Sequence, residues 1–486
     1  MVSPILVIAL SLFFTFVIPL LGMLSKKLPR LVPPIAILIN LWILLTNTKH
    51  VTKGAMLITT GGFKPPIAIN MAIDRFGLLF ALLIQTIGFI LAVYYLFQKN
   101  RDQRFYMLFL LNILGATGIV MTGDLFNSFV FLEILEISSS GLVASGKDKK
   151  ALKGSFKYMT VGAIGSSLYL LGITVLYFAT GSLNMAEIAR MMPRIPRNIK
   201  LFSALLFLVG IGVEAELFPL NAWAPDTYQG APDEVSAQLS SITSKAGIYL
   251  AARIFFTIFN GLDILHVILY PGVITFVIAE LVALMQKNVK RMLAYSSIAQ
   301  MGLILSVLSL VAKREDIFIL TTVILLAINH AFSKGLLFLS LGTLSGKSGE
   351  YEIATLKGNG KANPFAGFLF VSGALSILGM PLSFGFWSKI SALISVMKAN
   401  MIWLIGIILL ISLIEVYYYG NVIVHLFSGE GKKHKIEIIP SLVMLIFAGF
   451  VIVFGIWPHP VFQVAHGAAI ALLERSNYIL SITGGL

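Results

Sequence analysis

The sequence predicts an all-α integral membrane protein with about 14 transmembrane helices, and three observations support this fold class. Of the 486 residues, 57% are hydrophobic and 12% are charged, and the mean hydropathy is +0.91. A soluble domain has about 45 to 50% apolar and about 25% charged residues, so these side chains are too apolar to cover a water-facing surface. Apolar runs of about 20 residues, the length that crosses a bilayer as a helix, follow one another along the chain.

Each predicted helix is an apolar run bounded by charged residues or by Gly and Pro. The fourteen runs are residues 2–24, 31–47, 76–97, 105–122, 125–143, 155–178, 201–223, 237–259, 264–285, 294–312, 317–344, 365–394, 402–426 and 440–457. No connection between them is long enough to hold a soluble domain.

The residues that flank the runs predict the orientation. The first run has no basic residue before it and Lys26 and Lys27 after it, which is typical of a retained span rather than of a cleaved signal peptide. Lys and Arg are more frequent in the odd-numbered connections, which are therefore predicted to be cytoplasmic, with both termini outside. After Trp457, apolar residues recur at helical spacing around Glu474 and Arg475, which predicts a C-terminal amphipathic helix on the surface or on a partner.

The charge and the lack of cysteine exclude several classes of function. The chain has no Cys, which excludes thiolate-held iron–sulfur clusters, disulfides and a Cys nucleophile. The net charge of +14 is concentrated next to the apolar runs, where it favours membrane topology and anionic headgroups over a nucleic-acid partner. The largest clusters are Lys147, Lys149, Lys150, Lys153 and Lys157, and Lys287, Lys290 and Arg291.

Ionisable residues near the middle of the runs are the candidate functional residues. They are Glu133, Glu136, Glu214, Glu216, Lys245, His330, Lys334, Lys389 and Glu415. A charge at the centre of a membrane helix costs at least about 2.5 kcal/mol, so the eight charged members would cost about 20 kcal/mol in contact with lipid. We therefore expect them to pair, to face a protein interior or to line water, as an ion or proton relay does; for any one of them the alternative is an interhelical salt bridge.

Spacing places some of these residues on shared helix faces. Glu133 and Glu136 are three residues apart, so their like charges lie on one face. His330 and Lys334 are four residues apart and also share a face. Groups whose charge responds to a neighbour's charge are suited to a relay.

Two prolines predict broken helices. Pro219 follows Glu214 by about one turn, and Pro381 precedes Lys389 by about two turns; each proline frees carbonyls inside the membrane, as at the ion sites of transporters. The segments FPLNAW (218–223) and MPLSFGFW (380–387) resemble each other. They predict two inverted five-helix repeats, spans 4–8 and 9–13, with breaks in spans 7 and 12. The expected regions are 1–104, 105–260, 261–427 and 428–486.

Five stretches carry a resemblance to a known family. They are GDLFNSFVFLEIL (123–135), FPLNAWAPDTYQGAPDEVSAQLSSITSKAGIYLAAR (218–253), QKNVKRMLAYSSIAQMG (286–302), INHAFSKGLLFLSLG (328–342) and LGMPLSFGFWSKI (378–390). The chain resembles the antiporter-like subunits of respiratory complex I, of Mrp-type cation/proton antiporters and of membrane-bound hydrogenase or sulfur-reducing complexes. The stretches cover most of spans five to twelve.

The resemblance implies a role for each matching residue. Glu133 matches the family's glutamate of the fifth span, Lys245 the lysine of the eighth, His330 and Lys334 the central pair between two half-channels, and Lys389 the outlet lysine of the twelfth. The family's seventh-span lysine falls on Glu214, so a salt bridge with Glu133 is impossible there. Three outcomes are then expected for the first half-channel: a proton shared between carboxylates, a bound sodium ion, or the loss of transport. A sodium ion would lie near Glu133, Glu214 and Glu216, because hard cations take oxygen ligands.

The expected function is a proton- and/or sodium-translocating subunit of a multisubunit respiratory or antiporter complex in a prokaryotic plasma membrane. The chain is not expected to be catalytic alone or to hold a cofactor or metal cluster. Redox cofactors are expected in partner membrane subunits and a peripheral module, as in an NADH-quinone oxidoreductase, hydrogenase or sulfur reductase. Two alternatives stay open: a stand-alone transporter for an organic solute, and a scaffold subunit that does not pump.

Overall fold

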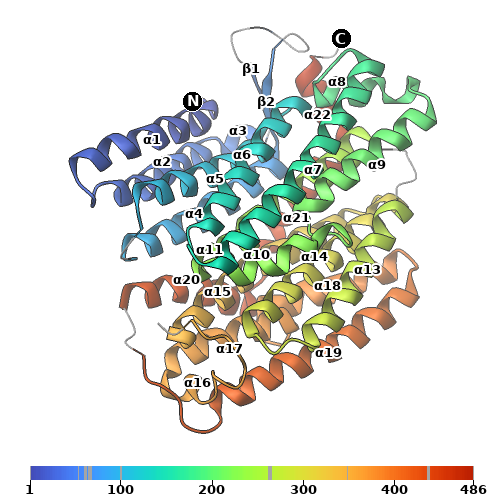
Figure 1. Ribbon diagram of the computed structural model, residues 1–486. Coiled ribbons are helices and arrows are strands. Elements are labelled where there is room, and N and C mark those ends of the chain that lie inside the picture. Colours follow the sequence, from blue (N-terminus) through green and yellow to red (C-terminus); the bar gives the residue numbers. More distant parts are fainter. Residues whose placement is uncertain are drawn as a thin grey trace.

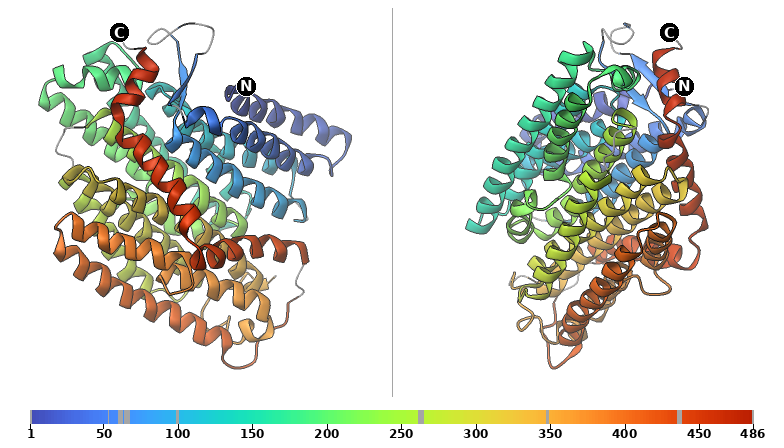
Figure 2. Two further views of the ribbon diagram at one scale, coloured as in Figure 1. Left: turned by 180° about the vertical axis from the view of Figure 1, so that it is seen from behind. Right: turned by 90° about the vertical axis from the view of Figure 1, so that its right-hand side faces the viewer.

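The computed structural model describes residues 2–52, 54–59, 63, 68–98, 101–260, 265–346, 349–434 and 438–484, most of which are helical. The long helices lie side by side and run in roughly one direction (Figure 1). The early helices form one end of the molecule and the orange helices α17 (Pro364–Leu378) to α19 (Ile402–Phe427) the other, with the green and yellow middle of the chain between them, while the red C-terminal helices run back toward the first end (Figure 2).

The long and short α-helices follow in chain order. They are α1 (Ile5–Leu24), α2 (Val32–Thr46), α3 (Thr48–Val51), α4 (Arg75–Leu96), α5 (Gln103–Met121), α6 (Leu125–Ala144), α7 (Lys149–Thr180), α8 (Met185–Met191), α9 (Arg197–Glu214), α10 (Ala224–Gly230), α11 (Asp233–Gln238), α12 (Ser244–Arg253), α13 (Leu265–Leu284), α14 (Val289–Lys313), α15 (Ile317–Ser345), α16 (Asn359–Ala362), α17 (Pro364–Leu378), α18 (Phe384–Lys398), α19 (Ile402–Phe427), α20 (Ile438–Ile456), α21 (His459–Leu473) and α22 (Arg475–Thr483). The 3-10 segments are η1 (Pro29–Leu31), η2 (Met192–Arg194) and η3 (Leu220–Trp223), and two π-helical segments are η4 (Leu239–Thr243) and η5 (Ile254–Ile258).

Aspartates set the first residue of several long helices. The side chains of Asp74, Asp102, Asp124 and Asp148 each accept a hydrogen bond from the backbone N–H three residues on, at the starts of α4, α5, α6 and α7. A capping carboxylate satisfies one of the N–H groups that the first helical turn leaves free. These helices therefore begin within a few residues of the apolar runs that predict them, except α7, which begins before its run.

Ten described helices are long and apolar enough to cross a membrane, or eleven if α20 and α21, which meet at 89°, form one span. Ten of the fourteen predicted runs match these helices. The other four, 201–223, 237–259, 365–394 and 440–457, contain breaks, charges or the sharp bend. The structure thus supports a multi-pass membrane-type helical protein, while length and composition alone do not give fourteen spans.

A short hairpin departs from the all-α prediction. Strands β1 (Met56–Thr59) and β2 (Asn70–Ile73) pair antiparallel, with Met56 opposite Ile73. The hairpin stands at the end of the molecule where the chain terminates (Figure 1). The sequence pattern did not predict it because neither strand, MLIT nor NMAI, alternates between apolar and polar residues.

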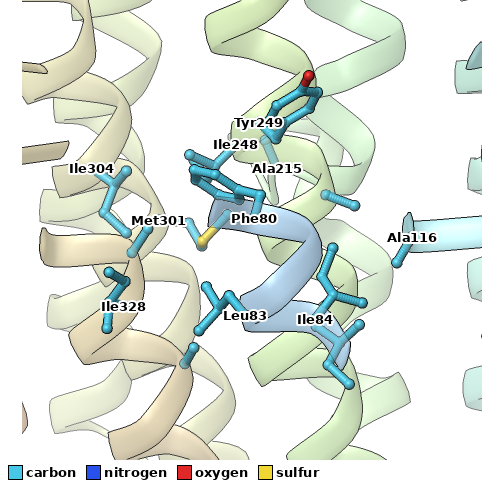
Figure 3. Close-up of a cluster of buried hydrophobic side chains, with 14 of the residues drawn as sticks. Phe80, Leu83, Ile84, Ala116, Ala215, Ile248, Tyr249, Met301, Ile304 and Ile328 are labelled. Carbon is cyan, nitrogen blue, oxygen red and sulfur yellow. The ribbon is translucent and has the colours of Figure 1, made fainter. Parts of the chain in front are cut away.

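Helices α14 and α15 form the buried centre of the molecule. Helix α15 packs against α11, α14, α17, α18, α20 and α21. Helices α13 and α14 approach most closely at Gly302, where an added Cβ would lie 2.5 Å from the backbone N of Phe276. Figure 3 shows apolar side chains of α4, α12, α14 and α15, among them Phe80, Ile248 and Ile328, packed together where these helices meet.

The C-terminal tail forms two helices rather than the single predicted amphipathic one. Helix α21 buries Ala465, Ala468, Ala469 and Leu472, one face of the helix, and packs on α4 and α15. It crosses the back of the molecule, and α22 continues it to the β-hairpin (Figure 2). The tail therefore covers its own chain.

Candidate ion-relay site

Buried ionisable side chains form a row through the middle of the helices. The row contains the buried Glu136, Glu214, Glu216, Lys245, His330, Lys334 and Glu415 and the partly buried Lys389, and it extends over α6, the end of α9, α12, α15, α18 and α19. Tyrosine hydroxyls lie between several members. Unpaired charges in a low-dielectric interior are strongly unfavourable, so the charge state of each group in this row depends on the charge state of its neighbours.

The first carboxylate pair is Glu136 with Glu214. Both side chains are buried and interact electrostatically. The Tyr158 hydroxyl donates to both oxygens of Glu214, at 2.9 and 3.1 Å, and its ring stacks on Trp223 with centroids 4.0 Å apart. One oxygen of Glu136, Oε1, has no hydrogen-bond partner among the described residues. The two carboxyl groups are therefore suited to sharing one proton.

Glu133 lies elsewhere than the resemblance implied. It is half-buried on the face of α6 that also carries the exposed Phe126, Val130 and Ile137. It interacts with Glu136 from this more exposed side, and it makes no hydrogen bond with any residue that the structure describes. Residues three apart lie only about 60° apart around a helix, so Glu133 and Glu136 are neighbours on α6. Glu136 is the buried member of the two, and its charge interacts with that of Glu214. Among the described residues, the α6 carboxylate that interacts with Glu214 is therefore Glu136, in place of the expected Glu133.

The break after α9 brings Glu216 into the row. Helix α9 ends at Glu214, and Glu216 has a left-handed φ of 57° before Pro219. The Tyr228 hydroxyl donates to Oε1 of Glu216 at 2.5 Å, while Oε2 has no partner among the described residues. Helix α12 packs closely on this break, because an added Cβ at Gly247 would lie 3.0 Å from the carbonyl carbon of Glu214. In this position the charge of Glu216 interacts with the charges of Lys245 and Lys334.

The three carboxylates expected to surround sodium do not converge. Glu133 faces outward, and Glu214 and Glu216 accept hydrogen bonds from different tyrosines. Within the described ranges, no group of three or more His, Cys, Asp or Glu residues is placed to hold a metal ion. A proton shared between carboxylates fits this half better than a cation bound by all three.

Lys245, His330 and Lys334 occupy the centre. Lys245 Nζ donates to the Ser240 carbonyl at 2.7 Å and to the Ser244 hydroxyl at 2.8 Å, and it meets His330 Nδ1. His330 Nε2 lies 3.2 Å from the Ser297 hydroxyl. When Lys245 donates, Nδ1 must accept, so the imidazole is neutral with its proton on Nε2. This arrangement can pass a proton across the ring.

Lys334 connects this centre to the second half. Its Nζ donates to the Leu293 carbonyl at 3.2 Å and to the Tyr419 hydroxyl at 3.1 Å. The Tyr419 hydroxyl also lies 3.1 Å from the Ser296 hydroxyl. Lys334 interacts electrostatically with Glu415 and Lys389.

The partly buried Lys389 of α18 and the fully buried Glu415 of α19 form an ion pair. Gln300 donates to the other oxygen of Glu415 at 2.6 Å, and Lys389 Nζ also donates to the Leu378 carbonyl at 3.3 Å. The carbonyl is free because α17 ends at Leu378, three residues before Pro381. Gly379 has φ 74°, and the Lys389 side chain crosses it so closely that an added Cβ would lie 2.7 Å from Lys389 Cδ.

Several polar residues of the site were missed by the sequence reasoning. Glu280 lies in the predicted run 264–285 and could have been found by the same search for charges inside spans. Arg253 in run 237–259 could also have been found; it pairs with Asp74 at 2.6 Å, and its guanidinium lies 4.8 Å from the Tyr478 ring of α22. Tyr158, Tyr228 and Tyr419 carry no sequence signal, because a buried tyrosine is ordinary in a helical core.

An ion cluster lies at one end of the first half. Asp226 of α10 pairs with Lys157 of α7 at 2.5 Å and with Arg291 of α14 at 2.6 Å. Burial alone would raise the pKa of Asp226, but hydrogen bonds and charge from Lys157 and Arg291 outweigh burial and lower it to about 2. Lys157 and Arg291, which were interpreted from the sequence as topology signals, therefore also connect α7, α10 and α14 through Asp226.

Comparison with known proteins identifies the family. The family model described as "NADH:quinone oxidoreductase/Mrp antiporter, TM" matches residues 122–415. The chain belongs to this family. The matched segment contains all nine ionisable residues that the sequence singled out, from Glu133 to Glu415. The resemblance drawn from the five motifs is confirmed.

Individual relatives of this family cover nearly the whole chain. The chain is 32% identical to an NADH-quinone oxidoreductase subunit of Desulforudis audaxviator, over 86% of this chain and 85% of the relative. It is 27% identical to a Na⁺/H⁺ antiporter subunit of Alkalihalophilus pseudofirmus, over 88% and 89%. A chain of the membrane-bound sulfane sulfur reductase, an archaeal respiratory membrane complex, matches with a TM-score of 0.91 at 35% identity over 99% of both chains.

Proposed function

We propose that this chain is an ion-translocating membrane subunit of a multisubunit respiratory or antiporter complex, and that it conducts protons. One observation carries the proposal: from Glu136 to Lys389, each member of the row interacts with the next. The links are Glu136–Glu214, Glu214–Glu216, Glu216–Lys245, Lys245–His330, His330–Lys334, Lys334–Glu415 and Glu415–Lys389. A scaffold has no need of a row whose members are costly to bury.

Protons suit the chemistry of the row. Carboxylic acids, amines, imidazole and tyrosine hydroxyls all accept and release protons over hydrogen-bond distances. Sodium would need several oxygen ligands around one point, and the described carboxylates are spread along the row instead. The row from Glu136 to Lys389 is therefore proposed as the site, with Glu133 as an outer neighbour and with Pro219 and Pro381 ending the two broken helices.

The proposed topology has fourteen crossings. Four of them would be α9, the helix from α11 to η5, the broken pair α17 and α18, and α20, in addition to the ten helices that qualify by length and composition. The regions 105–260 and 261–427 would be inverted repeats, flanked by 1–104 and 428–486. The basic connections place odd loops in the cytoplasm of a prokaryotic plasma membrane and both termini outside.

The proposed partners are other membrane subunits. The relatives are named as subunits of NADH-quinone oxidoreductase and of a Na⁺/H⁺ antiporter, and the matching structure is a respiratory complex. Because the chain lacks Cys, the redox cofactors are proposed to reside in partner subunits, including a peripheral module.

The test combines purification and transport. A tagged full-length chain is purified from its native membrane, its partners are identified by mass spectrometry, and the complex is reconstituted with a pH-sensitive dye inside the vesicles. Under an imposed ion gradient, Lys334→Ala should abolish proton movement, and Lys361→Ala, at an exposed lysine, should not. Equal proton movement in wild type, Lys334→Ala and Lys389→Ala would instead favour the scaffold. A chain that purifies alone and moves an organic solute would favour the stand-alone transporter.

A further inference from the structure

Glu280 of α13 is a buried carboxylate that the row from Glu136 to Lys389 does not include. Its side chain is 0% exposed. Neither Oε1 nor Oε2 has a hydrogen-bond partner of normal geometry among the described residues, although the Tyr418 hydroxyl lies beside the carboxyl group. A buried group in this state needs an explanation, because buried polar atoms are nearly always paired.

The charges around Glu280 come from three other helices. Glu415 of α19, Lys389 of α18 and Lys334 of α15 all interact with it electrostatically, and Tyr418 of α19 lies against it. The two lysines are already engaged: Lys389 pairs with Glu415, and Lys334 donates to Leu293 and Tyr419. Gln300 of α14 donates to Glu415 and not to Glu280. The cluster thus places two lysine side chains beside two carboxyl groups, but of the two carboxyl groups only that of Glu415 receives a hydrogen bond from a described residue.

An ionised Glu280 would be a buried charge without a hydrogen bond, which is far more unfavourable than burying the neutral acid. We propose that Glu280 is a proton-holding residue of the second half, neutral while Lys389 pairs with Glu415 and ionised when Lys389 turns toward it. The proton that leaves the carboxyl oxygen goes to the neutral amine of Lys334, so the charge of the cluster is conserved. This inference rests on the proposed function and adds a residue of α13 to it.

The first test measures protonation without transport. Dicyclohexylcarbodiimide reacts with protonated carboxyl groups in apolar surroundings, and peptide mass spectrometry locates the adduct. In the purified full-length chain we expect an adduct at Glu280. In Glu415→Gln, Lys389 loses its partner and Glu280 is the carboxyl group of the cluster that remains, so the adduct should decrease about tenfold, the ratio given by about 1.4 kcal/mol. Glu430→Gln, at an exposed loop residue, is the matched control and should leave the adduct unchanged.

Two results would overturn the inference: no adduct at Glu280 in the wild-type chain, or equal adducts in wild type and Glu415→Gln. Infrared spectroscopy covers the case in which Glu415→Gln fails to fold. The carbonyl band of a protonated acid should then be weaker in Glu280→Gln than in wild type, and an unchanged band would also overturn the inference.

The second test separates this inference from the proposed function. In reconstituted vesicles, Glu280→Gln should slow proton movement, and Glu280→Asp should restore part of it. If wild type moves protons and Glu280→Gln moves them equally, the role of Glu280 fails and the proposed function stands. If Glu280 takes the adduct but wild type moves no protons, the proposed function fails and the protonated state of Glu280 stands.

Discussion

The Nζ atom of Lys245 lies 2.5 Å from Nδ1 of His330, although 85 residues separate them in the chain. Ser240 and Ser244 hold the lysine on one side, and Ser297 meets the far nitrogen of the imidazole. The ring therefore has a basic group at one nitrogen and a hydroxyl at the other. This contact joins the helix after the first break to the central helix α15.

The first prediction concerns His330. His330→Ala removes the ring that connects Lys245 to Ser297, so proton movement by the reconstituted complex should fall about 10²-fold, the loss typical of removing a proton-transferring group. Ser297→Ala leaves Nδ1 in contact with Lys245 and should have a much smaller effect. The rate of dye acidification measures both variants, and similar rates would argue against transfer through the ring.

The second prediction distinguishes the two glutamates of α6. Glu136 interacts with Glu214 inside the protein, whereas Glu133 lies on the more exposed face. Glu136→Gln should therefore reduce proton movement more than Glu133→Gln in the same vesicles. The reverse order would show that the outward-facing glutamate, as the family resemblance implied, controls the first half.

The third prediction concerns the ion pair of Lys389 and Glu415. Lys389→Ala leaves Glu415 buried and uncompensated, so the free energy of unfolding should decrease by about 3 kcal/mol, as for other broken buried pairs. In the double variant Lys389→Ala with Glu415→Leu no charge of the pair is left unpaired, and much of the stability should return. Thermal unfolding in detergent measures all three variants together with Glu415→Leu. If the decreases in unfolding free energy of the two single variants add up to the decrease of the double variant, the two side chains do not interact energetically.

The fourth prediction tests the close contact between α13 and α14 at Gly302. Gly302→Ala places a methyl group 2.5 Å from the backbone of α13, where nothing flexible can move aside. Its free energy of unfolding should decrease by about 1 to 3 kcal/mol. Gly406 of α19 has no atom of a described residue within 4 Å of an added Cβ, so Gly406→Ala should be neutral or should stabilise by about 0.5 to 1 kcal/mol. Midpoints of thermal unfolding compare the two variants, and an equally stable Gly302→Ala would mean that the two helices can separate at little cost.

The fifth prediction concerns pH and Asp226. Its pKa of about 2 in the folded chain lies below the ordinary value of 3.8. Its charged form therefore stabilises the fold above pH 3.8, and this contribution disappears as the pH falls toward 2. Asp226→Asn should have a lower unfolding temperature than wild type at about pH 6, and the difference should shrink below about pH 4. A difference that stays constant across this range would show that the ion pairs with Lys157 and Arg291 do not stabilise the chain.

Composition and spacing were sufficient for the class of fold and for locating most of the buried ionisable residues of the row. A chain this apolar must bury its helices in lipid, and a charge inside an apolar run can be recognised in the sequence itself, since it is costly in lipid whichever helix carries it. The five motifs also identified the family, whose model matches residues 122–415. Pro219 and Pro381 indicated the breaks that follow α9 and α17, because a proline lacks the backbone N–H that a helix needs.

Only the tertiary structure decided which of these residues meet. Glu136 instead of Glu133 faces Glu214, Tyr158 and Tyr228 bind the carboxylates, and Glu280 joins the cluster of Lys389 and Glu415. These contacts depend on how one helix is rotated against another, and the packing of many apolar side chains determines that rotation. A hydropathy pattern shows that a residue lies inside the membrane, but it does not show which side chain lies across from it.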